Sequence, residues 1–350
     1  MRQIAVDLGI PQKEFRARLR AVYNNTGAIV IKLPGDEKLE KDLSANWPGV
    51  TYHVLDAEGD HFFRRAAEVF FAEMSQILPN RSTRRPFRIG VVSGRTTGGM
   101  IEAICNINQN WGDLMPLERL PQEIFIYALN VSQIDGYDHL KGNANVLAYQ
   151  LAHRFRTEVK QSKVEAYGLS AKLLQTKQEV QRSDCTAETR AVLKYTDPER
   201  LRASLEAQGE KGVEQLPAKS QLDVVITGVG SIEDSLFREY LTANSFDVDR
   251  LQKVQWVVGD IAYCPVTRVG EPQTLSKDNQ EWEFYRAISL EVLREMSQED
   301  DKKVLVVAID TPESKKTNII HAAIAESAKF CNVLITDVTT ADTLKIKLGR

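Results

Sequence analysis

Residues 91–99 of this chain read Val-Val-Ser-Gly-Arg-Thr-Thr-Gly-Gly, a short glycine- and threonine-rich stretch around which the rest of the sequence is organised. They follow the apolar run 86–90 and precede the helix-like sequence 100–111. A strand, a glycine loop and a helix N-terminus in this order form an anion site, because glycine lets a ligand approach the backbone and the first N–H groups of the helix favour negative charge. Ser93, Gly94, Thr96 and Thr97 supply hydroxyl and backbone donors, and Arg95 supplies a planar cation suited to phosphate. A plain structural turn is the alternative interpretation of such a loop.

Strands and helices alternate along the rest of the chain. We expect strands at 27–32, 51–55, 87–93, 123–131, 222–227, 254–258, 303–309 and 333–336, and helices at 34–44, 61–78, 98–110, 143–156, 232–243, 282–296, 315–330 and 340–348. Apolar strands alternating with amphipathic helices predict an α/β fold, a Rossmann-like parallel sheet covered by helices on both faces. In that architecture ligands collect at the carboxyl ends of the strands.

The composition narrows the class of protein. A chain of 350 residues with 27% charged side chains and a net charge of −3 is an ordinary globular protein, and as a whole it is not a polyanion binder. The four cysteines are far apart and form no CxxC pair, and the five histidines are equally scattered, so we expect no metal and no cofactor. Neither a signal peptide nor a membrane span is visible, which predicts a cytoplasmic protein with no membrane partner.

The first residues of the chain are locally basic. Residues 2–20 contain five Lys or Arg side chains against two acidic ones. The sequence 4–19 has the pattern of the last two helices of a helix-turn-helix, whose second helix would read DNA through Lys13, Arg16, Arg18 and Arg20. An amphipathic helical hairpin for dimer contacts is the alternative. We place the domain boundary near residues 55–60, with a partial winged helix-turn-helix and linker over 1–57 and the main domain over 58–350.

Three more strand ends carry candidate ligand contacts. Gly228, Gly230 and Ser231 form a second glycine loop between a strand and a helix. Asp260 follows an apolar run, where its carboxylate can accept hydrogen bonds from ligand hydroxyls, although a turn aspartate is the alternative. Lys315 and Lys316 begin a helix, where a cation opposes the helix dipole unless an anion compensates it.

Taken in order, these segments resemble the SorC family of bacterial transcriptional regulators that sense sugar phosphates. The resemblance rests on the motifs IAVDLGIPQKEFRARL, GAIVIKLP, VVSGRTTGG, GNANVLAYQLA, TGVGS, VVGDI, KTNIIHAAI and NVLITDVTTADTL, which run from residue 4 to residue 344. It implies an effector domain with the fold of ribose-5-phosphate isomerase and glucosamine-6-phosphate deaminase that binds a phosphorylated sugar without turning it over.

The resemblance also implies roles for the candidate residues. The loop from Gly94 to Thr97 and the loop from Gly228 to Ser231 would line the site, and Asp260 would bind sugar hydroxyls. Lys316 would meet a phosphate or a hydroxyl. The family has a Gly-Gly pair before its lysine, whereas this chain has a longer, stiffer loop, so Lys315 is the alternative to Lys316.

The function expected from this resemblance is regulation rather than catalysis. The ligand would be a phosphorylated sugar, the other partner a DNA operator, and the assembly a homodimer or homotetramer. One alternative is a sugar-phosphate isomerase or deaminase, with Asp260, Glu233 or His139 as its acid or base. The other is a sensor that has lost DNA binding and acts through a protein partner.

Overall fold

The computed structural model describes residues 35–78, 85–131, 142–210, 213–233, 235–311 and 315–348. The predicted helix-turn-helix, with Lys13, Arg16, Arg18 and Arg20, lies outside the described residues, as does the predicted strand at 27–32.

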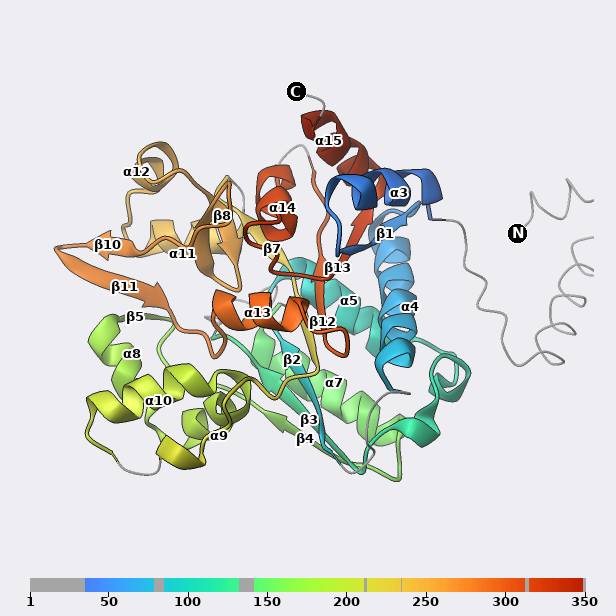
Figure 1. Cartoon of the computed structure of the whole chain (residues 1–350), viewed down its shortest axis with the longest axis horizontal. Coiled ribbons are helices and arrows are strands. Elements are labelled where there is room, and N and C mark those ends of the chain that lie inside the picture. Colours follow the sequence, from blue (N-terminus) through green and yellow to red (C-terminus); the bar gives the residue numbers. More distant parts are fainter. Residues whose placement is uncertain are drawn as a thin grey trace, which may run out of the picture.

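A seven-stranded sheet forms the centre of the molecule, and every strand pair in it is parallel (Figure 1). Its order is β1-β13-β12-β6-β2-β3-β4. The strands are β1 (Thr51–Leu55), β2 (Phe87–Val91), β3 (Glu123–Ala128), β4 (Lys163–Tyr167), β6 (Val224–Thr227), β12 (Lys303–Val307) and β13 (Val333–Asp337). From β2 the chain adds β3 and β4 on one side, and from β6 it adds β12 and β13 on the other. The direction of winding therefore reverses between β2 and β6, which is where ligands bind in open α/β sheets.

Apolar clusters cover both faces of this sheet, as predicted for a parallel sheet. In β12, Leu305 and Val307 belong to one cluster while Val304 and Val306 belong to the other, because successive side chains of a strand point to opposite faces. The first cluster lies under α4 (Gly59–Ile77), α5 (Arg95–Asn106) and α7 (Ala144–Glu158). The α/β fold class is confirmed.

The other helices are shorter. They are α3 (Glu37–Asn46), α8 (Lys177–Asp184), α9 (Ala187–Thr196), α10 (Pro198–Ala207), α11 (Leu236–Ala243), α12 (Val248–Lys253), α13 (Leu290–Ser297), α14 (Thr317–Ile324) and α15 (Val338–Leu348), with 3-10 turns at Trp111–Asp113, Leu117–Arg119 and Val213–Gln215. No helix among the described residues has the length and apolar character needed to cross a bilayer.

Two small antiparallel sheets were not predicted. One has the order β10-β11-β5, with β5 (Leu174–Thr176), β10 (Leu275–Lys277) and β11 (Gln280–Phe284); the other has the order β7-β8-β9, with β7 (Val229–Ser231), β8 (Val257–Ile261) and β9 (Cys264–Thr267). The strand predicted at 254–258 therefore begins three residues later and belongs to a small sheet instead of the central one.

The helix predicted over 282–296 is wrong in its first half. Residues 280–284 form β11, which pairs with β10 and β5, and the helix begins only at Leu290. Trp282 and Phe284 alternate with glutamates, which is the period of a strand, and the Ser289 hydroxyl caps the helix by accepting the N–H of Val292.

The lobe formed by α8, α9 and α10 is fixed to β11 through the buried carboxylate of Asp184. Arg200 donates from Nε to Oδ2 at 2.9 Å and from a terminal nitrogen to Oδ1 at 3.0 Å. The hydroxyls of Ser204 and Tyr285 donate to the same carboxylate at 2.8 and 2.5 Å. Both oxygens of Asp184 therefore have their partners within the fold.

The sheet begins before the predicted domain boundary. β1 pairs with β13 at five positions, and Leu39 and Leu43 of α3 are buried in the cluster that also holds Tyr52 and Val54 of β1. These residues lie in the part that was assigned to the N-terminal unit. We therefore propose that the effector domain starts near residue 35 rather than residue 58.

Candidate functional site

A cavity of about 90 Å³ lies at the carboxyl ends of β2 and β6, the point where the winding of the sheet reverses. Eight of the eleven predicted ligand contacts line it: Ser93, Gly94, Arg95, Thr96, Gly228, Gly230, Asp260 and Lys316. The sequence did not indicate the other lining residues, Val229, Ser235, Leu236, Phe237, Ala262 and Tyr263. Thr97, Ser231 and Lys315 are not among the residues that line this cavity.

The first wall of the cavity is the start of α5. Gly94 is the N-cap residue of this helix, with φ of +152°, so no side chain caps the first N–H groups. The N–H of Gly94 itself donates to the carbonyl of Gly142 at 2.9 Å. The N–H groups of the first helical turn have no partner inside a helix, so they are available to an anion. Helix α5 starts at Arg95, three residues earlier than predicted, which brings Arg95 and Thr96 into this turn.

The two glycine loops approach each other closely. A β-carbon added to Gly228 would lie 3.1 Å from Oγ1 of Thr96 and 3.3 Å from Oγ1 of Thr97. A side chain at position 228 would therefore fit tightly and would require Thr96 and Thr97 to move by a few tenths of an ångström. Thr97 is fully buried, and its hydroxyl has no hydrogen-bond partner in the described part of the chain.

Ser93 is held in place by Asn130, a buried residue that the sequence did not single out. The side-chain oxygen of Asn130 accepts the N–H of Ser93 at 2.8 Å, and its amide nitrogen donates to Oγ of Ser93 at 2.6 Å. Asn130 follows the end of β3, beside β2 in the sheet, so its position after an apolar strand is the signal that could have revealed it.

The opposite wall comes from β8. Asp260 is only 4% exposed, and its Oδ2 accepts the N–H of Tyr263 at 2.8 Å, while Oδ1 has no hydrogen-bond partner among the described residues. A β-carbon on Gly230 would lie 2.1 Å from that Oδ1, so glycine alone fits there. Burial raises the pKa of Asp260 to about 7, against the opposing effects of the Tyr263 N–H and of the Lys316 charge.

The neighbouring lysines diverge. Lys316 lines the cavity, whereas Lys315 has φ of +44° and places its Nζ 2.5 Å from a carboxylate oxygen of Glu233. Asp310 fixes this arrangement, because its carboxylate accepts the backbone N–H of Lys316 and the hydroxyl of Thr317. The structure thus brings Lys316 rather than Lys315 to the predicted site.

Ser235 occupies the place expected for Ser231. Ser231 is buried, and its hydroxyl accepts the N–H of Glu233 at 3.1 Å. Ser235 lines the cavity and caps α11 by accepting the N–H of Arg238 at 3.2 Å. The position of Ser235 directly before a helix is a capping signal in the sequence.

Arg95 reaches across the surface to α11. Its guanidinium lies 2.9 Å from a carboxylate oxygen of Glu239, and the two side chains are 63% and 46% exposed. Exposed ion pairs of this kind contribute little stability, so an anion can displace Glu239 at small cost.

Of the acid and base groups proposed for an enzyme, the two that the structure describes, Asp260 and Glu233, do not converge here. Among the described carboxylates, Asp260 lines the cavity, while Glu233 pairs with Lys315 outside it. His139 lies outside the described residues. Within the described ranges, no group of three or more His, Cys, Asp or Glu side chains could hold a metal ion.

Comparison with known proteins identifies the fold. No protein-family model and no curated protein sequence matches the chain. Among solved structures, the full-length sorbitol operon regulator SorC from Klebsiella pneumoniae matches with a TM-score of 0.61 and 16% identity, over 98% of this chain and 92% of that one. A DeoR family transcriptional regulator from Listeria monocytogenes matches with a TM-score of 0.55 and 18% identity, over 88% of this chain and 98% of that one.

A domain described as sugar-binding, from a transcriptional repressor of Vibrio fischeri, matches with a TM-score of 0.58 and 12% identity, over 90% of this chain and 100% of that one. The resemblance seen in the sequence is thus confirmed at the level of the fold, which is that of SorC and DeoR regulators.

Proposed function

We propose that this protein is an effector-responsive transcriptional regulator of the SorC type, which binds a phosphorylated sugar at the β2–β6 cavity without turning it over. The proposal rests on one observation: the N-terminus of α5, Lys316 and Asp260 line the same cavity, at the point where the winding of the sheet reverses. One oxygen of Asp260 has no hydrogen-bond partner among the described residues. This set combines an anion site with an acceptor for hydroxyls. The fold shared with sugar-operon regulators supports the same conclusion.

Each end of the ligand has its own contacts in this proposal. The phosphate binds the first N–H groups of α5 and the guanidinium of Arg95, displacing Glu239. The sugar hydroxyls bind Asp260 and Lys316. We infer binding without turnover because, among the described Asp, Glu and His side chains, Asp260 alone lines the cavity, whereas a sugar-phosphate isomerase or deaminase of the kind considered above would place a second such group beside it.

The position of the cavity supports a change of packing on binding. A ligand held there contacts the loop after β2, the loop after β6 and strand β8 together, so it stabilises the arrangement in which these segments enclose it. This preference shifts the population toward that arrangement, which is how an effector changes a regulator.

The DNA-binding part of the proposal rests on the sequence. Lys13, Arg16, Arg18 and Arg20 would contact an operator, and a homodimer or homotetramer would place two such helices on successive half-sites. An operator affinity that is indifferent to every effector would count against this part of the proposal. Loss of operator binding altogether would leave a sensor that acts through a protein partner.

A thermal-shift screen tests the ligand class. The full chain is heated with hexose, pentose and triose phosphates and with the same sugars unphosphorylated. A ligand at about 100 times its dissociation constant adds about 2.7 kcal/mol of stability. We expect a phosphorylated sugar to raise the melting temperature and its unphosphorylated counterpart to have little effect.

The adjacent lysines provide a matched pair of variants for the same screen. Lys316→Ala should abolish the shift, whereas Lys315→Ala should retain it, because Lys315 pairs with Glu233 outside the cavity. Equal losses in the two variants, or no stabilisation by any sugar phosphate, would contradict the proposed site.

A further inference from the structure

The turn between β8 and β9 has an unusual backbone. Ala262 and Tyr263 form its two central positions, since Ile261 pairs with Cys264, and their φ angles are +51° and +63°. Hairpin turns with both central residues in the left-handed region ordinarily contain Asn-Gly or Asp-Gly, because other side chains are strained there. Both residues line the cavity. Strained backbone of this kind is found preferentially at ligand-binding sites.

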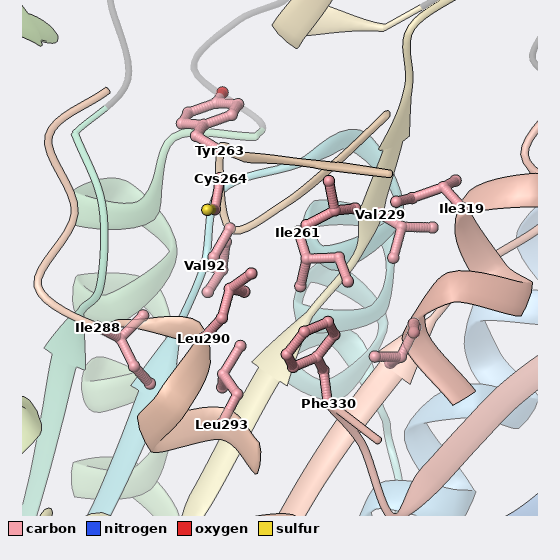
Figure 2. Close-up of a cluster of buried hydrophobic side chains, with 14 of the residues drawn as sticks. Val92, Val229, Ile261, Tyr263, Cys264, Ile288, Leu290, Leu293, Ile319 and Phe330 are labelled. Carbon is pink, nitrogen blue, oxygen red and sulfur yellow. The ribbon is translucent and has the colours of Figure 1, made fainter. Parts of the chain in front are cut away.

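The strained turn presents a phenol to the cavity. Figure 2 shows Val229, Ile261 and Ile319 together in the apolar cluster, with the hydroxyl of Tyr263 pointing away from them. The Tyr263 ring packs edge-on against Tyr240, with ring centroids 5.8 Å apart, and at a tilt against Phe284, with centroids 5.6 Å apart. These two contacts fix the direction of the ring.

The hydroxyl itself is buried. Tyr263 is 4% exposed, and its oxygen makes no hydrogen bond of normal geometry within the described part of the chain; the side chains of Ser93 and Tyr240 are the polar groups that interact with it. Oδ1 of Asp260, three residues earlier and on the same wall, has no hydrogen-bond partner among the described residues. Buried polar atoms are almost always hydrogen-bonded, so two such atoms beside one cavity are available to pair with a group that enters it.

We infer that Tyr263 is a specificity-determining residue, whose hydroxyl acts with Oδ1 of Asp260 to bind one hydroxyl group of the sugar. A hydroxyl both donates and accepts, so it satisfies a carboxylate acceptor and a phenol donor together. A ligand that lacks this hydroxyl leaves both protein atoms buried and unpaired, which selects against deoxy sugars. The inference rests on the proposed function, since it concerns how Tyr263 and Asp260 recognise a hydroxyl group of the sugar that is proposed to bind in the cavity.

The test compares two buried tyrosines by the same substitution. Tyr263→Phe removes a hydroxyl that makes no hydrogen bond of normal geometry among the described residues, and Tyr285→Phe removes one that donates to Asp184. Each full-length variant is melted without ligand and then titrated calorimetrically with glucose 6-phosphate, ribose 5-phosphate, dihydroxyacetone phosphate, 2-deoxyribose 5-phosphate and inorganic phosphate.

We expect Tyr263→Phe to melt at or above the wild-type temperature without ligand, to bind inorganic phosphate as the wild type does, and to lose at least tenfold in affinity for the sugar phosphate that the wild type prefers. Tyr285→Phe should melt lower and keep its affinity. A Tyr263→Phe variant that melts clearly lower, or that binds the preferred sugar phosphate unchanged, overturns the inference while the proposed function stands. Failure of every phosphate compound to bind the wild type overturns both.

Discussion

Two buried aspartates, Asp184 and Asp260, have opposite surroundings. Asp184 is fully buried and accepts hydrogen bonds from Arg200, Ser204 and Tyr285 at both of its oxygens. Asp260 is 4% exposed and accepts one hydrogen bond, from the N–H of Tyr263, at one oxygen only. Burial of a carboxylate is costly unless it is paired and hydrogen-bonded. The first aspartate is thus compensated within the fold, whereas the second keeps one oxygen unpaired, which we propose a ligand completes.

This difference separates structural polar groups from functional ones in the same chain. The partners of Asp184 are Arg200 and Ser204 of α10 and Tyr285, the residue after β11, so its network joins the helical lobe to a small sheet and uses both carboxylate oxygens. Asp260 instead faces a cavity where glycine is required at position 230 and where Lys316 supplies positive charge. A saturated network stabilises one arrangement, and an unsaturated one lowers stability until a ligand binds.

The largest expected loss of stability follows from removing Asp184, whose oxygens both have hydrogen-bond partners. Asp184→Ala leaves the guanidinium of Arg200 and two hydroxyls without their acceptor, and removal of one partner of a buried pair costs about 3–5 kcal/mol. We expect a large fall in the denaturant midpoint of unfolding. A loss below about 1 kcal/mol would mean that other groups take over the pairing of Arg200.

The second effect concerns Asp260, whose contribution to the free energy of unfolding depends on pH. The folded-state pKa of Asp260 is raised to about 7, so between about pH 4 and pH 7 the folded chain binds more protons than the unfolded one. The contribution of Asp260 therefore lowers the free energy of unfolding as pH rises through this range. At about 1.4 kcal/mol per pKa unit, the fall is at most about 4 kcal/mol.

Asp260→Asn should remove this dependence, because the amide stays neutral. Unfolding measured from pH 4 to pH 8 should show the variant gaining stability relative to the wild type as pH rises. Parallel profiles for the two proteins would contradict the unpaired state of Asp260.

A steric change comes third. Gly230→Ala places a carbon 2.1 Å from Oδ1 of Asp260 and forces the carboxylate or the loop to move. Overpacking of this kind costs about 1–3 kcal/mol. Gly112→Ala is the matched control, because its new carbon would lie 3.4 Å from its nearest neighbour. Equal melting temperatures of the two variants would show that the Gly230 contact is not tight.

The smallest effect concerns the strained turn. Ala262→Gly relieves a left-handed residue at φ of +51°, a conformation that costs other residues about 1–2 kcal/mol. Part of this gain is offset by the greater freedom of glycine in the unfolded chain, so we expect stabilisation of about 0.5–1 kcal/mol. A variant that is less stable than the wild type would show that the Ala262 methyl group packs better than the strain costs.

Much of the central sheet could be predicted because its strands are apolar on both faces. The cavity residues that directly follow such strands, Ser93 to Thr96 and Gly228, were predicted by the same rule. Whether they hold a ligand stays a prediction. Ser231 and Lys315 were expected there and lie elsewhere, because single backbone angles and the acceptors Asp310 and Glu233 decide which of two adjacent polar side chains turns inward.

The small sheets were missed for a different reason. Their strands have three to five residues, too few for a period to be recognised beside a helix signal such as that of 282–296. The place of Tyr263 beside the cavity could not be predicted from the sequence. It depends on a turn in which both Ala262 and Tyr263 have left-handed backbone angles, and the dipeptide Ala-Tyr does not predict such a turn.

The affinity for operator DNA, measured with and without the phosphorylated sugar at one fixed salt concentration, shows whether the sugar site and the DNA site are coupled as proposed. The DNA is first selected from random fragments by the full chain, and Lys316→Ala serves as the variant that should not respond to the sugar. We expect the sugar phosphate to change the DNA dissociation constant of the wild type by about 5- to 150-fold, the usual range of coupling between sites. An unchanged dissociation constant, in a protein that demonstrably binds both DNA and the sugar phosphate, would contradict the account.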